Sequence, residues 1–433
     1  MVSDPKKPAK IYIRNYGCAS NIADGETISG CLSKGGYRIV SDEKEASVLI
    51  YNTCAVKTQT ENKVINALKN VPKDKRLIIT GCLPLINLER LSREISWHGV
   101  TGPSPGRRIV DVVECAIRGA KFTFLNNNQK PPLALPHRES SRVVKILPVC
   151  YGCLGACTYC CVRFARGPLR SYTTKEIVDS LKDAVKRGFR EIWLTAQDLA
   201  CYGRDIDTDL VELLHEIDHI DGNFVVRLGM MNPANVVPIL HELMNVFRSK
   251  KFFKFLHLPL QSGDDTVLKD MGRQYTAKII REIVADFRER IGQFTLATDV
   301  IYGFPTESDA AFKNSLSLLR DIRPDITNVS RFFPRPMTPA NGLAQLPLSV
   351  INDRAQALSR LSVEISAERN KEWLGWSGEV IVDERRHPDS MISRNFAYKP
   401  IAIETKEDLL GKIAFVMVTN YHSSYLNGVL AHF

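Results

Sequence analysis

The segment Cys153-Leu-Gly-Ala-Cys157-Thr-Tyr-Cys160 places three thiols in one short loop, directly after an apolar stretch from Val144 to Val149 that predicts a strand. Three thiolates at this spacing can hold three irons of a 4Fe-4S cube and leave the fourth iron open. A zinc site is the alternative interpretation, and it would want a fourth protein ligand. The segment therefore predicts a metal centre on a loop that follows a strand.

The cysteine content of the chain favours metal ligation or catalysis over a disulfide framework. The total of 11 is odd. The polar start from Met1 to Lys10 has no apolar segment behind it, so we expect a cytoplasmic protein without a secretory signal or membrane-spanning helix. Disulfides are rare in that reducing compartment. Five cysteines receive no predicted role: Cys31, Cys115, Cys150, Cys161 and Cys201.

Length, composition and charge bound the class of protein. A chain of 433 residues holds about three domains at roughly 150 residues each. Its composition, with 44% hydrophobic and 24% charged residues, is typical of soluble globular proteins and excludes the disordered and fibrous classes. The net charge of +10 suggests a polyanionic partner such as nucleic acid, and an ordinary solvated surface is an equal alternative.

Strands and helices alternate around the cysteine loop, from about Arg142 to Glu372. In one crossover segment Ile177, Leu181 and Ala184 recur at helical spacing, and Gly188 follows as a stop signal. Six such parallel units predict a partial (βα)6 barrel. The expected strands lie near Val144 to Val149, Glu191 to Leu194, Phe224 to Gly229, Phe253 to Leu258, Thr295 to Asp299 and Thr327 to Phe332.

The N-terminal part alternates short apolar strands with amphipathic segments, which predicts an open parallel α/β sheet. Its expected strands are Lys10 to Asn15, Val48 to Asn52 and Leu77 to Thr80. A cysteine follows each of them closely: Cys18, Cys54 and Cys82. Because ligand sites of such sheets lie at the carboxyl ends of strands, these thiols can converge on one metal centre. For any single one of them, a buried inert cysteine is the better interpretation.

The predicted fold class is therefore α/β with a small β-barrel at the end. The segment from Asn126 to Ser141 reads as a linker, and short strands follow Trp373. Those strands are Glu379 to Asp383, Lys399 to Ile403, Ile413 to Thr419 and Val429 to Ala431. The expected domains are residues 1–125, 142–366 and 367–433.

The cysteine loop resembles that of the radical S-adenosylmethionine enzymes, through Cys153, Cys157, Tyr159 and Cys160. The resemblance implies that the open iron is chelated by S-adenosylmethionine, which yields a 5′-deoxyadenosyl radical while the protein orients and shields it. It also gives Tyr159 the role of seating the adenine. A core tyrosine is the alternative.

Further motifs narrow the resemblance to the methylthiotransferase family over nearly the whole chain, and within it to the archaeal and eukaryotic branch. The motifs are Tyr16-Gly-Cys18-x-x-Asn21-x-x-Asp24-x-Glu26, Asn52-Thr-Cys54, Gly81-Cys82, Gly167 to Tyr172, Arg227-Leu-Gly-Met-Met-Asn-Pro233, Gln261-Ser-Gly263, Gly303-Phe-Pro305 and Ser330-Arg-Phe-Phe-Pro-Arg-Pro336. Met337 departs from the pattern, because a glycine would be more usual there. Because the sequence runs to Phe433 within the expected β-barrel, we expect a soluble archaeal-type form without the membrane anchor of eukaryotic members.

The resemblance implies a reaction. N6-threonylcarbamoyladenosine next to the anticodon, at tRNA position 37, would be converted to its 2-methylthio derivative by radical C–H to C–S chemistry. It implies two 4Fe-4S clusters, one on Cys153, Cys157 and Cys160 and a sulfur-donating one on Cys18, Cys54 and Cys82. S-adenosylmethionine would serve as radical source and methyl donor. The implied partners are tRNA, an electron donor and a sulfur donor, with no membrane.

Polar residues at the carboxyl ends of two barrel strands are further candidates for contacting S-adenosylmethionine. They are Thr195, Gln197 and Asp198 after the second strand and Gln261 and Ser262 after the fourth. For Asp198 and Ser262, turn capping is an equal interpretation.

Arginines near the loop could bind tRNA phosphate or the substrate carboxylate, since a guanidinium suits either anion. They are Arg163, Arg166 and Arg170, and structural salt bridges are an equal interpretation. The tail resembles a TRAM domain, an RNA-binding module of the family, through Arg394, Asn395, Tyr398 and Lys399.

Three rival functions stay open. His215-Glu216-Ile-Asp-His219 matches a zinc-peptidase pattern, although no third ligand is obvious and a solvated helix face is the alternative. A non-catalytic iron-sulfur protein that binds RNA or transfers electrons would need no open iron. The third rival is a methylthiotransferase with another substrate, either isopentenyladenosine in tRNA or an aspartate of a ribosomal protein. Only the resemblance to particular family members separates this rival from the predicted function.

Overall fold

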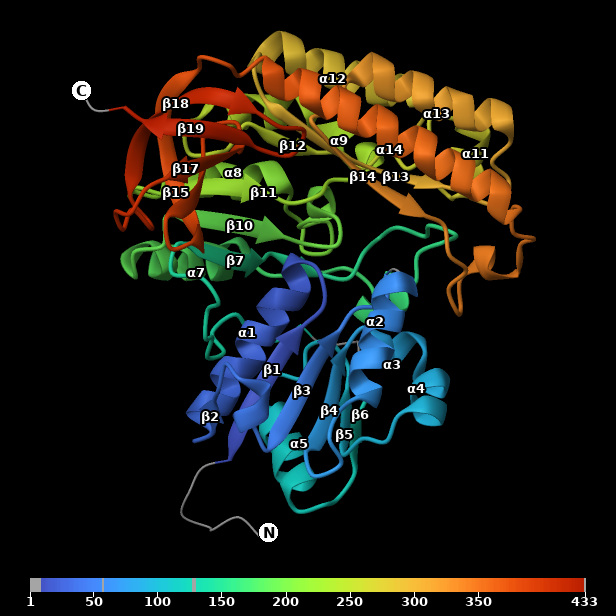
Figure 1. The fold of residues 1–433 in the computed structure, drawn as a ribbon, viewed down its shortest axis with the longest axis vertical. Coiled ribbons are helices and arrows are strands. Elements are labelled where there is room, and N and C mark those ends of the chain that lie inside the picture. The colour runs from blue at the N-terminus through green and yellow to red at the C-terminus, as the bar shows by residue number, and fades with distance from the viewer. Residues whose placement is uncertain (1–8, 57, 127–129, 432–433) are drawn as a thin grey trace. The chain divides into compact units, whose positions relative to one another are not determined.

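The computed structural model describes residues 9–56, 58–126 and 130–431, so the first eight residues and part of the expected linker lie outside it. The chain forms two compact units (Figure 1). The first unit comprises Met1–Ser140, Pro148–Tyr172 and Phe333–Asn341, and the second comprises Ser141–Leu147, Thr173–Phe332 and Gly342–Phe433. The cysteine loop thus belongs to the same unit as the N-terminal sheet. The three expected domain boundaries stay a prediction.

A six-stranded sheet of order β2-β1-β3-β4-β5-β6 forms the first unit, with every neighbouring pair parallel. Its strands are β1 (Lys10–Asn15), β2 (Arg38–Ile39), β3 (Val48–Thr53), β4 (Arg76–Gly81), β5 (Gly99–Thr101) and β6 (Phe122–Phe124). The three predicted strands are confirmed. β2, β5 and β6 were not predicted, because segments of two or three residues show no periodicity.

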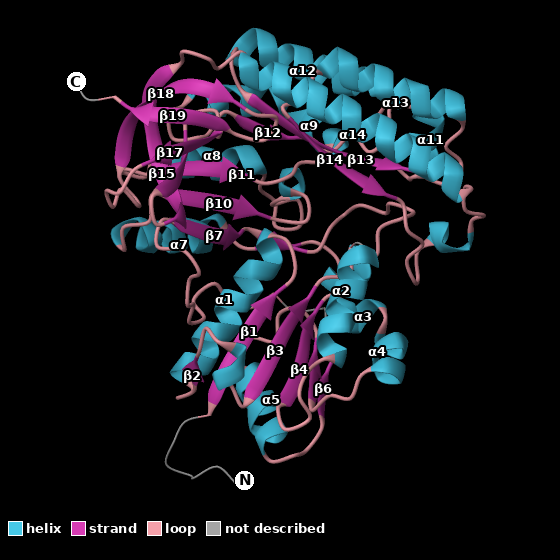
Figure 2. Cartoon of the chain, in the orientation of Figure 1, coloured by secondary structure: helices cyan, strands magenta, loops and turns pink. Residues whose placement is uncertain are grey.

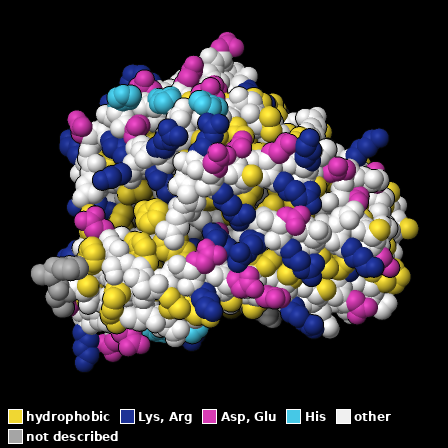
Figure 3. Space-filling view, turned by 90° about the horizontal axis from the view of Figure 1, so that it is seen from above, with side chains coloured by type: hydrophobic (Ala, Val, Ile, Leu, Met, Phe, Trp, Pro, Cys, Tyr) yellow, Lys and Arg dark blue, Asp and Glu magenta, His cyan; other side chains and the backbone are white. Residues whose placement is uncertain are grey.

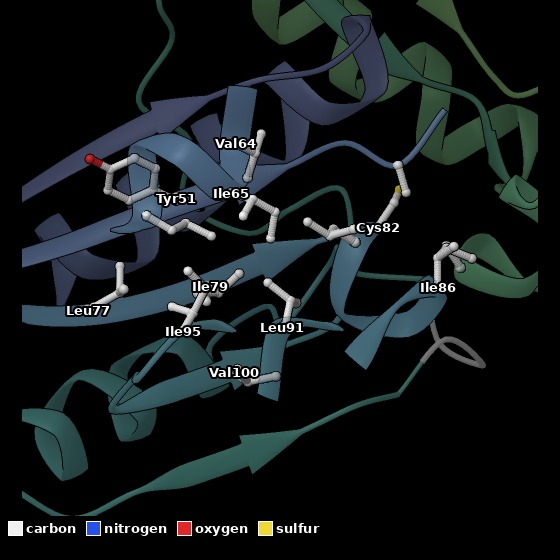
Figure 4. Close-up of a cluster of buried hydrophobic side chains, with 14 of the residues drawn as sticks. Tyr51, Val64, Ile65, Leu77, Ile79, Cys82, Ile86, Leu91, Ile95 and Val100 are labelled. Atoms are coloured by element: carbon white, nitrogen blue, oxygen red, sulfur yellow. The ribbon is translucent and has the colours of Figure 1, made fainter. Parts of the chain in front are cut away.

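Helices cover both faces of this sheet (Figure 2). They are α1 (Ala19–Lys34), α2 (Thr58–Lys69), α3 (Leu83–Ile86), α4 (Leu88–Glu94) and α5 (Arg108–Ile117), and α6 (Val162–Arg166) follows the cysteine loop. Leu49 and Tyr51 pack into one core and Val48 and Ile50 into the other, because successive strand residues face opposite sides. Figure 4 shows the first core, to which Tyr51 and Ile79 of the sheet and Val64 of α2 all belong. Burial on both faces explains the nearly continuous apolar runs.

The second unit contains the predicted partial barrel. Its sheets have the orders β11-β10-β7 and β12-β13-β14, and a parallel bridge between Val226 and Phe252 connects them. The strands are β7 (Val144–Pro148), β10 (Glu191–Thr195), β11 (Val225–Leu228), β12 (Phe255–His257), β13 (Thr295–Tyr302) and β14 (Ile326–Arg331). All six predicted strands are confirmed in chain order. The fold class is the predicted α/β architecture.

Helices alternate with these barrel strands. They include α7 (Thr174–Lys186), α8 (Leu210–Asp218), α10 (Leu240–Arg248), α12 (Ala277–Ile291) and α13 (Asp309–Ile322). The crossover helix predicted from sequence is α7, which begins with a capping box between Thr173 and Glu176 and buries Ile177, Leu181 and Ala184. Within the described residues, no helix is long and apolar enough to cross a membrane.

A long helix, α14 (Leu348–Lys371), precedes a closed barrel of order β15-β16-β17-β19-β18. The barrel strands are β15 (Ser377–His387), β16 (Ser390–Arg394), β17 (Pro400–Glu404), β18 (Ile413–Tyr421) and β19 (Leu426–Leu430). The four predicted strands are confirmed, and β16 was missed. Its burial pattern, three buried residues in a row, lacks the alternation that would have revealed it.

Candidate functional site

Cys54 and Cys82 lie at the ends of neighbouring strands of the first unit. Gly81 ends β4 with φ +99°, and a Cβ there would lie 2.2 Å from the Thr53 carbonyl oxygen of β3. The amide of Cys82 donates to the same oxygen at 3.0 Å. Because only glycine allows this approach, the Gly81-Cys82 motif holds the two cysteine-bearing strand ends together.

A buried asparagine network places Cys18 against the same edge of the sheet. Asn52 of β3 donates to the side chain of Asn15 at 2.9 Å and to the carbonyl of Asn21 at 2.6 Å. Asn21 in turn donates to Asn52 Oδ1 at 2.8 Å. The cysteine of this turn, Cys18, is the residue before α1 and is exposed. The asparagines of the sequence motifs therefore position the loop that carries Cys18.

The three strand-end thiols act on one another electrostatically. Burial is the largest of the effects that together raise the pKa of Cys82 to about 12, and the thiols of Cys54 and Cys18 act in the same direction. Burial also raises the pKa of Cys54. The Arg166 guanidinium opposes both shifts. A cation therefore stands beside a group of thiols that would have to lose their protons to bind iron.

Arg166 is 2% exposed and pairs with Asp24, with 2.7 Å between Nη2 and Oδ2. Asp24 Oδ1 accepts hydrogen bonds from Ser104 at 2.7 Å and from Tyr151 at 2.9 Å. At Arg166 the structure thus shows the buried salt bridge that was the alternative to anion binding. Arg163, in the same helix, is exposed, and Arg170 is half-buried and donates to the Arg166 carbonyl at 2.5 Å.

The cysteine loop leaves a short antiparallel ribbon formed by β8 (Cys150–Tyr151) and β9 (Arg170–Ser171). Gly152 closes it with φ +79°, where a Cβ would lie 1.8 Å from the Pro168 carbonyl oxygen. The amide of Cys153 then donates to the Gly167 carbonyl at 3.3 Å. Gly152 and Gly167, whose φ is +75°, therefore bring the ends of the loop together in a backbone conformation that favours glycine.

Inside this loop the first two thiols lie over a glycine. A Cβ on Gly155 would be 3.3 Å from Cys153 Sγ and 3.7 Å from Cys157 Sγ, and the Gly155 amide donates to Cys153 Sγ at 3.1 Å. The Cys160 amide donates to the Cys157 carbonyl at 3.1 Å. This turn brings the third cysteine of the loop back toward the first two. The space that a side chain would fill and the amide donor to sulfur suit an iron-sulfur cluster.

As the side chains stand, no three His, Cys, Asp or Glu groups of the described residues are close enough to hold a metal ion. The fit of the two triads to a cluster therefore rests on donor chemistry, backbone placement and the cradle at Gly155. Both ligand sets stay predictions.

Cys161, the cysteine next to the loop triad, is buried. Its thiol donates to the Ala55 carbonyl at 3.4 Å, and burial raises the pKa of this thiol.

The backbone conformation at Met337 explains why a glycine would be more usual at this position. Its φ is +64°, a conformation that glycine adopts freely and a methionine only with strain. The Met337 side chain is 52% exposed, so its bulk costs no packing.

The candidate cofactor contacts Asp198 and Ser262 belong to the second unit and make hydrogen bonds to other residues of that unit. Asp198 accepts from the amides of Ala200 at 3.2 Å and Asn232 at 3.0 Å and from the Asn235 side chain at 2.7 Å. Ser262 is fully buried and accepts from the Asp264 amide at 3.2 Å. Both residues thus cap turns, as the alternative interpretation expected, and contact with S-adenosylmethionine stays a prediction for them.

Gln261 adopts a backbone conformation that is unusual for a side chain of its size. Its φ is +63°, and its backbone bridges β13, donating to the Asp299 carbonyl at 2.8 Å and accepting from Ile301 at 2.9 Å. Strain of this kind concentrates at functional positions. Thr195 ends β10 and is buried, and Gln197 is half-buried. Their roles also stay predictions.

One pair at the carboxyl ends of the barrel strands was missed by the sequence analysis. His257 ends β12, and its Nε2 lies 2.7 Å from Asp299 Oδ2 of β13. Both side chains are partly exposed. The signal that could have found them is a pair of polar residues at strand ends, where barrel ligand sites lie.

The predicted RNA contacts of the tail are engaged within the second unit. Lys399 is 2% exposed, and its ammonium donates to Asp325 and Asn370 at 2.7 Å each. Arg394 Nε donates to Asp383 at 2.9 Å. On the face drawn in Figure 3, Lys and Arg side chains are interspersed with Asp and Glu. The structure shows no exposed cation at these two positions.

The zinc-peptidase pattern falls on an exposed helix end. His215 is exposed in α8, and His219 follows that helix as its C-cap. His219 Nδ1 lies 2.7 Å from the His215 carbonyl oxygen. This is the solvated face that the alternative interpretation expected.

Two family models match the chain. Residues 10–102 match the model described as uncharacterized protein family UPF0004, and residues 147–319 match the radical SAM superfamily. The first match contains Cys18, Cys54 and Cys82, and the second contains Cys153, Cys157 and Cys160.

Curated relatives are similar over nearly the whole chain. A protein of Pyrococcus abyssi named probable threonylcarbamoyladenosine tRNA methylthiotransferase is 42% identical over 97% of this chain and 99% of its own length. The threonylcarbamoyladenosine tRNA methylthiotransferase of Danio rerio is 33% identical over 97% of this chain and 78% of its own.

Solved structures share the fold. The radical S-adenosylmethionine methyltransferase TsrM of Kitasatospora setae, solved with cobalamin and a [4Fe-4S] cluster bound, has a TM-score of 0.56 at 15% identity. It covers 77% of each chain. At this identity the likeness concerns the fold alone.

Proposed function

We propose, from the premise that this chain belongs to the threonylcarbamoyladenosine tRNA methylthiotransferase family, that it is a transferase that converts N6-threonylcarbamoyladenosine in tRNA to its 2-methylthio derivative. The observation that carries the proposal is the occurrence of two cysteine triads in one compact unit, one in the cysteine loop and one at three strand ends. A protein with only one cluster could make a radical but would have no second centre from which to deliver sulfur.

The loop triad would hold a 4Fe-4S cluster through Cys153, Cys157 and Cys160. With S-adenosylmethionine, such a cluster would supply the 5′-deoxyadenosyl radical chemistry needed at C2 of the adenine. The loop's own contribution is geometric. Gly152 closes it and Gly155 leaves space between two thiols, so the ligands are presented by backbone that no side chain crowds.

The strand-end triad would hold the second cluster, which carries the sulfur to be transferred. Gly81 and the asparagines around Asn52 fix the backbone that presents Cys18, Cys54 and Cys82. These contacts are made by the chain's own backbone and side chains, so the cysteines are presented by strand ends that the sheet holds in place. Positioning of this kind matters since a misplacement near 1 Å can cost about 100-fold in rate.

The proposed partners are tRNA, a reductant and a sulfur donor, and the proposed compartment is the cytoplasm, where tRNA is modified. Tyr159, Thr195, Gln197 and Gln261 remain our candidates for contacts with S-adenosylmethionine. Arg163 is the exposed arginine of the loop helix and our remaining candidate there for a tRNA phosphate.

Mass spectrometry of tRNA nucleosides tests the proposal. Anaerobically reconstituted protein would be incubated with S-adenosylmethionine, sulfide, reductant and tRNA bearing N6-threonylcarbamoyladenosine. A 2-methylthio product is expected, and a chain with Cys18, Cys54 and Cys82 all replaced by alanine should form 5′-deoxyadenosine without it. If the methylthio product formed only on isopentenyladenosine tRNA, the substrate would be isopentenyladenosine. If fully loaded protein formed no 5′-deoxyadenosine, the non-catalytic iron-sulfur protein would be favoured.

A further inference from the structure

A buried arginine in the first unit has no role in the proposed function. Arg166 ends α6, six residues after Cys160 along the cysteine loop segment. At 2% exposure its side chain is out of reach of tRNA phosphate. A guanidinium cannot lose its proton in a protein, so a charge sits permanently inside the unit and needs partners.

The partners of Arg166 account for only part of its hydrogen-bonding capacity. Nη2 is 2.7 Å from Asp24 Oδ2, and the other oxygen of Asp24 accepts from Ser104 and Tyr151. These three contacts hold the carboxylate, and the carboxylate holds the guanidinium. Nη1 is buried and has no hydrogen-bond partner among the described residues. A buried donor without an acceptor costs about 1–3 kcal/mol, so its retention calls for an explanation.

The strand-end triad lies close to this part of α6, because Cys82 packs in the same buried cluster as Ala165, the residue before Arg166. Arg166 interacts with Cys82 and Cys18, and its charge also acts on Cys54. All three belong to the ligand set of one predicted cluster, and none belongs to the loop triad. Arg166 thus comes from the sequence segment of one triad and acts on the thiols of the other.

We propose that Arg166 is a positioning residue for the strand-end cluster: its Nη1 donates a hydrogen bond to a sulfur of that cluster, and Asp24 fixes the guanidinium for this task. The inference rests on the proposed function, because it requires a cluster on Cys18, Cys54 and Cys82. Hydrogen bonds to sulfur and nearby positive charge stabilise the reduced form, which carries one more negative charge. Arg166 therefore raises the reduction potential of the strand-end cluster.

The test isolates that cluster. The parent chain has Cys153, Cys157 and Cys160 replaced by alanine, is reconstituted with iron and sulfide, and is titrated with reductant while the reduced cluster is followed by electron paramagnetic resonance. Arg166→Gln in this parent should move the midpoint potential to a more negative value. Arg166→Lys keeps the positive charge but not the forked pair of donors. The midpoint potential of this variant should therefore lie between that of the parent and that of Arg166→Gln.

Arg163→Gln is the matched control, since Arg163 lies in the same helix and is exposed. It should leave the potential and the spectrum of the parent unchanged. A purely structural salt bridge predicts something else: Arg166→Gln would lower the melting temperature while the potential stayed that of the parent. That result would overturn the inference.

Three further outcomes are distinguishable. If the parent binds no iron, the second cluster does not exist, and both the proposed function and this inference fail. If Arg166→Gln does not load, Arg166→Lys decides alone: a loaded Lys variant with the parent's potential rules out the hydrogen bond, and a more negative potential supports it. A shift equal to that of Arg163→Gln would likewise count against a role specific to Arg166.

Discussion

The two cysteine triads of the first unit are built in opposite ways. The loop triad spans eight residues from Cys153 to Cys160 and depends on glycines that let one short segment close on itself. The strand-end triad draws Cys18, Cys54 and Cys82 from three strands, and its geometry depends on a parallel sheet and buried side-chain hydrogen bonds. The geometry of the loop triad therefore depends mainly on residues within one short segment. The geometry of the strand-end triad depends on the packing of the whole sheet.

Replacing one ligand in each triad should separate their functions most strongly. Cys157→Ala should reduce 5′-deoxyadenosine formation by on the order of 1000-fold or more, as removal of an essential catalytic group does. Cys54→Ala should keep that radical chemistry and lose the methylthio product. Roughly four irons per chain should remain in each variant, one cluster's worth. Anaerobic iron analysis with product quantification checks this, and equal losses in both assays would refute separate roles.

Gly81→Ala tests whether the strand-end triad depends on backbone approach. The new Cβ would meet the Thr53 carbonyl at 2.2 Å, so the ends of β3 and β4 must separate. Gly36→Ala is the control, because Gly36 also has positive φ, at 87°, but no atom lies within 4 Å of its Cβ. The control should cost about 1–2 kcal/mol of unfolding free energy from backbone strain alone.

Beyond that strain, Gly81→Ala should cost more in denaturant unfolding and should lose iron from the strand-end cluster while the loop cluster stays loaded. Equal unfolding free energies for the two variants would show that the close approach at Gly81 is unimportant.

Asn52→Ala tests the hydrogen-bond network of the same triad with a smaller expected effect. Asn52 is fully buried and donates to Asn15 and Asn21. Loss of its side chain leaves buried acceptors unpaired, which should cost about 1–3 kcal/mol. Urea unfolding of the metal-free chain measures this cost independently of cluster binding. A cost below 0.5 kcal/mol, the range of ordinary surface substitutions, would mean that the network does not position Cys18.

The smallest effect is expected at the zinc-peptidase pattern. His215→Ala changes an exposed residue of α8, so the unfolding free energy should change by no more than about 0.5 kcal/mol. Product formation should be unchanged, and added zinc should stimulate no peptidase activity. Zinc-dependent peptide cleavage that disappears in this variant would revive the rival function.

Most of the fold was accessible from sequence where periodicity was strong. The six strands of the partial barrel and three strands of the first unit were predicted, most of them as apolar runs, because buried strands need continuous apolar residues. The strands that were missed gave no pattern for different reasons: β2 has only two residues, and β16 lacks alternation. The left-handed backbone of Met337 and Gln261 was equally invisible in the sequence.

The sequence by itself determined which residues could carry the chemistry. The spacing of Cys153, Cys157 and Cys160 is local, so chain connectivity alone brings these thiols into one loop. Only the tertiary structure decided which polar residues form ion pairs and hydrogen bonds within the protein. Arg166, Lys399 and Asp198 looked like binding groups until their partners were visible. Burial and ion pairing depend on residues far apart in the chain, such as Asp24 and Arg166, and only the folded unit brings those together.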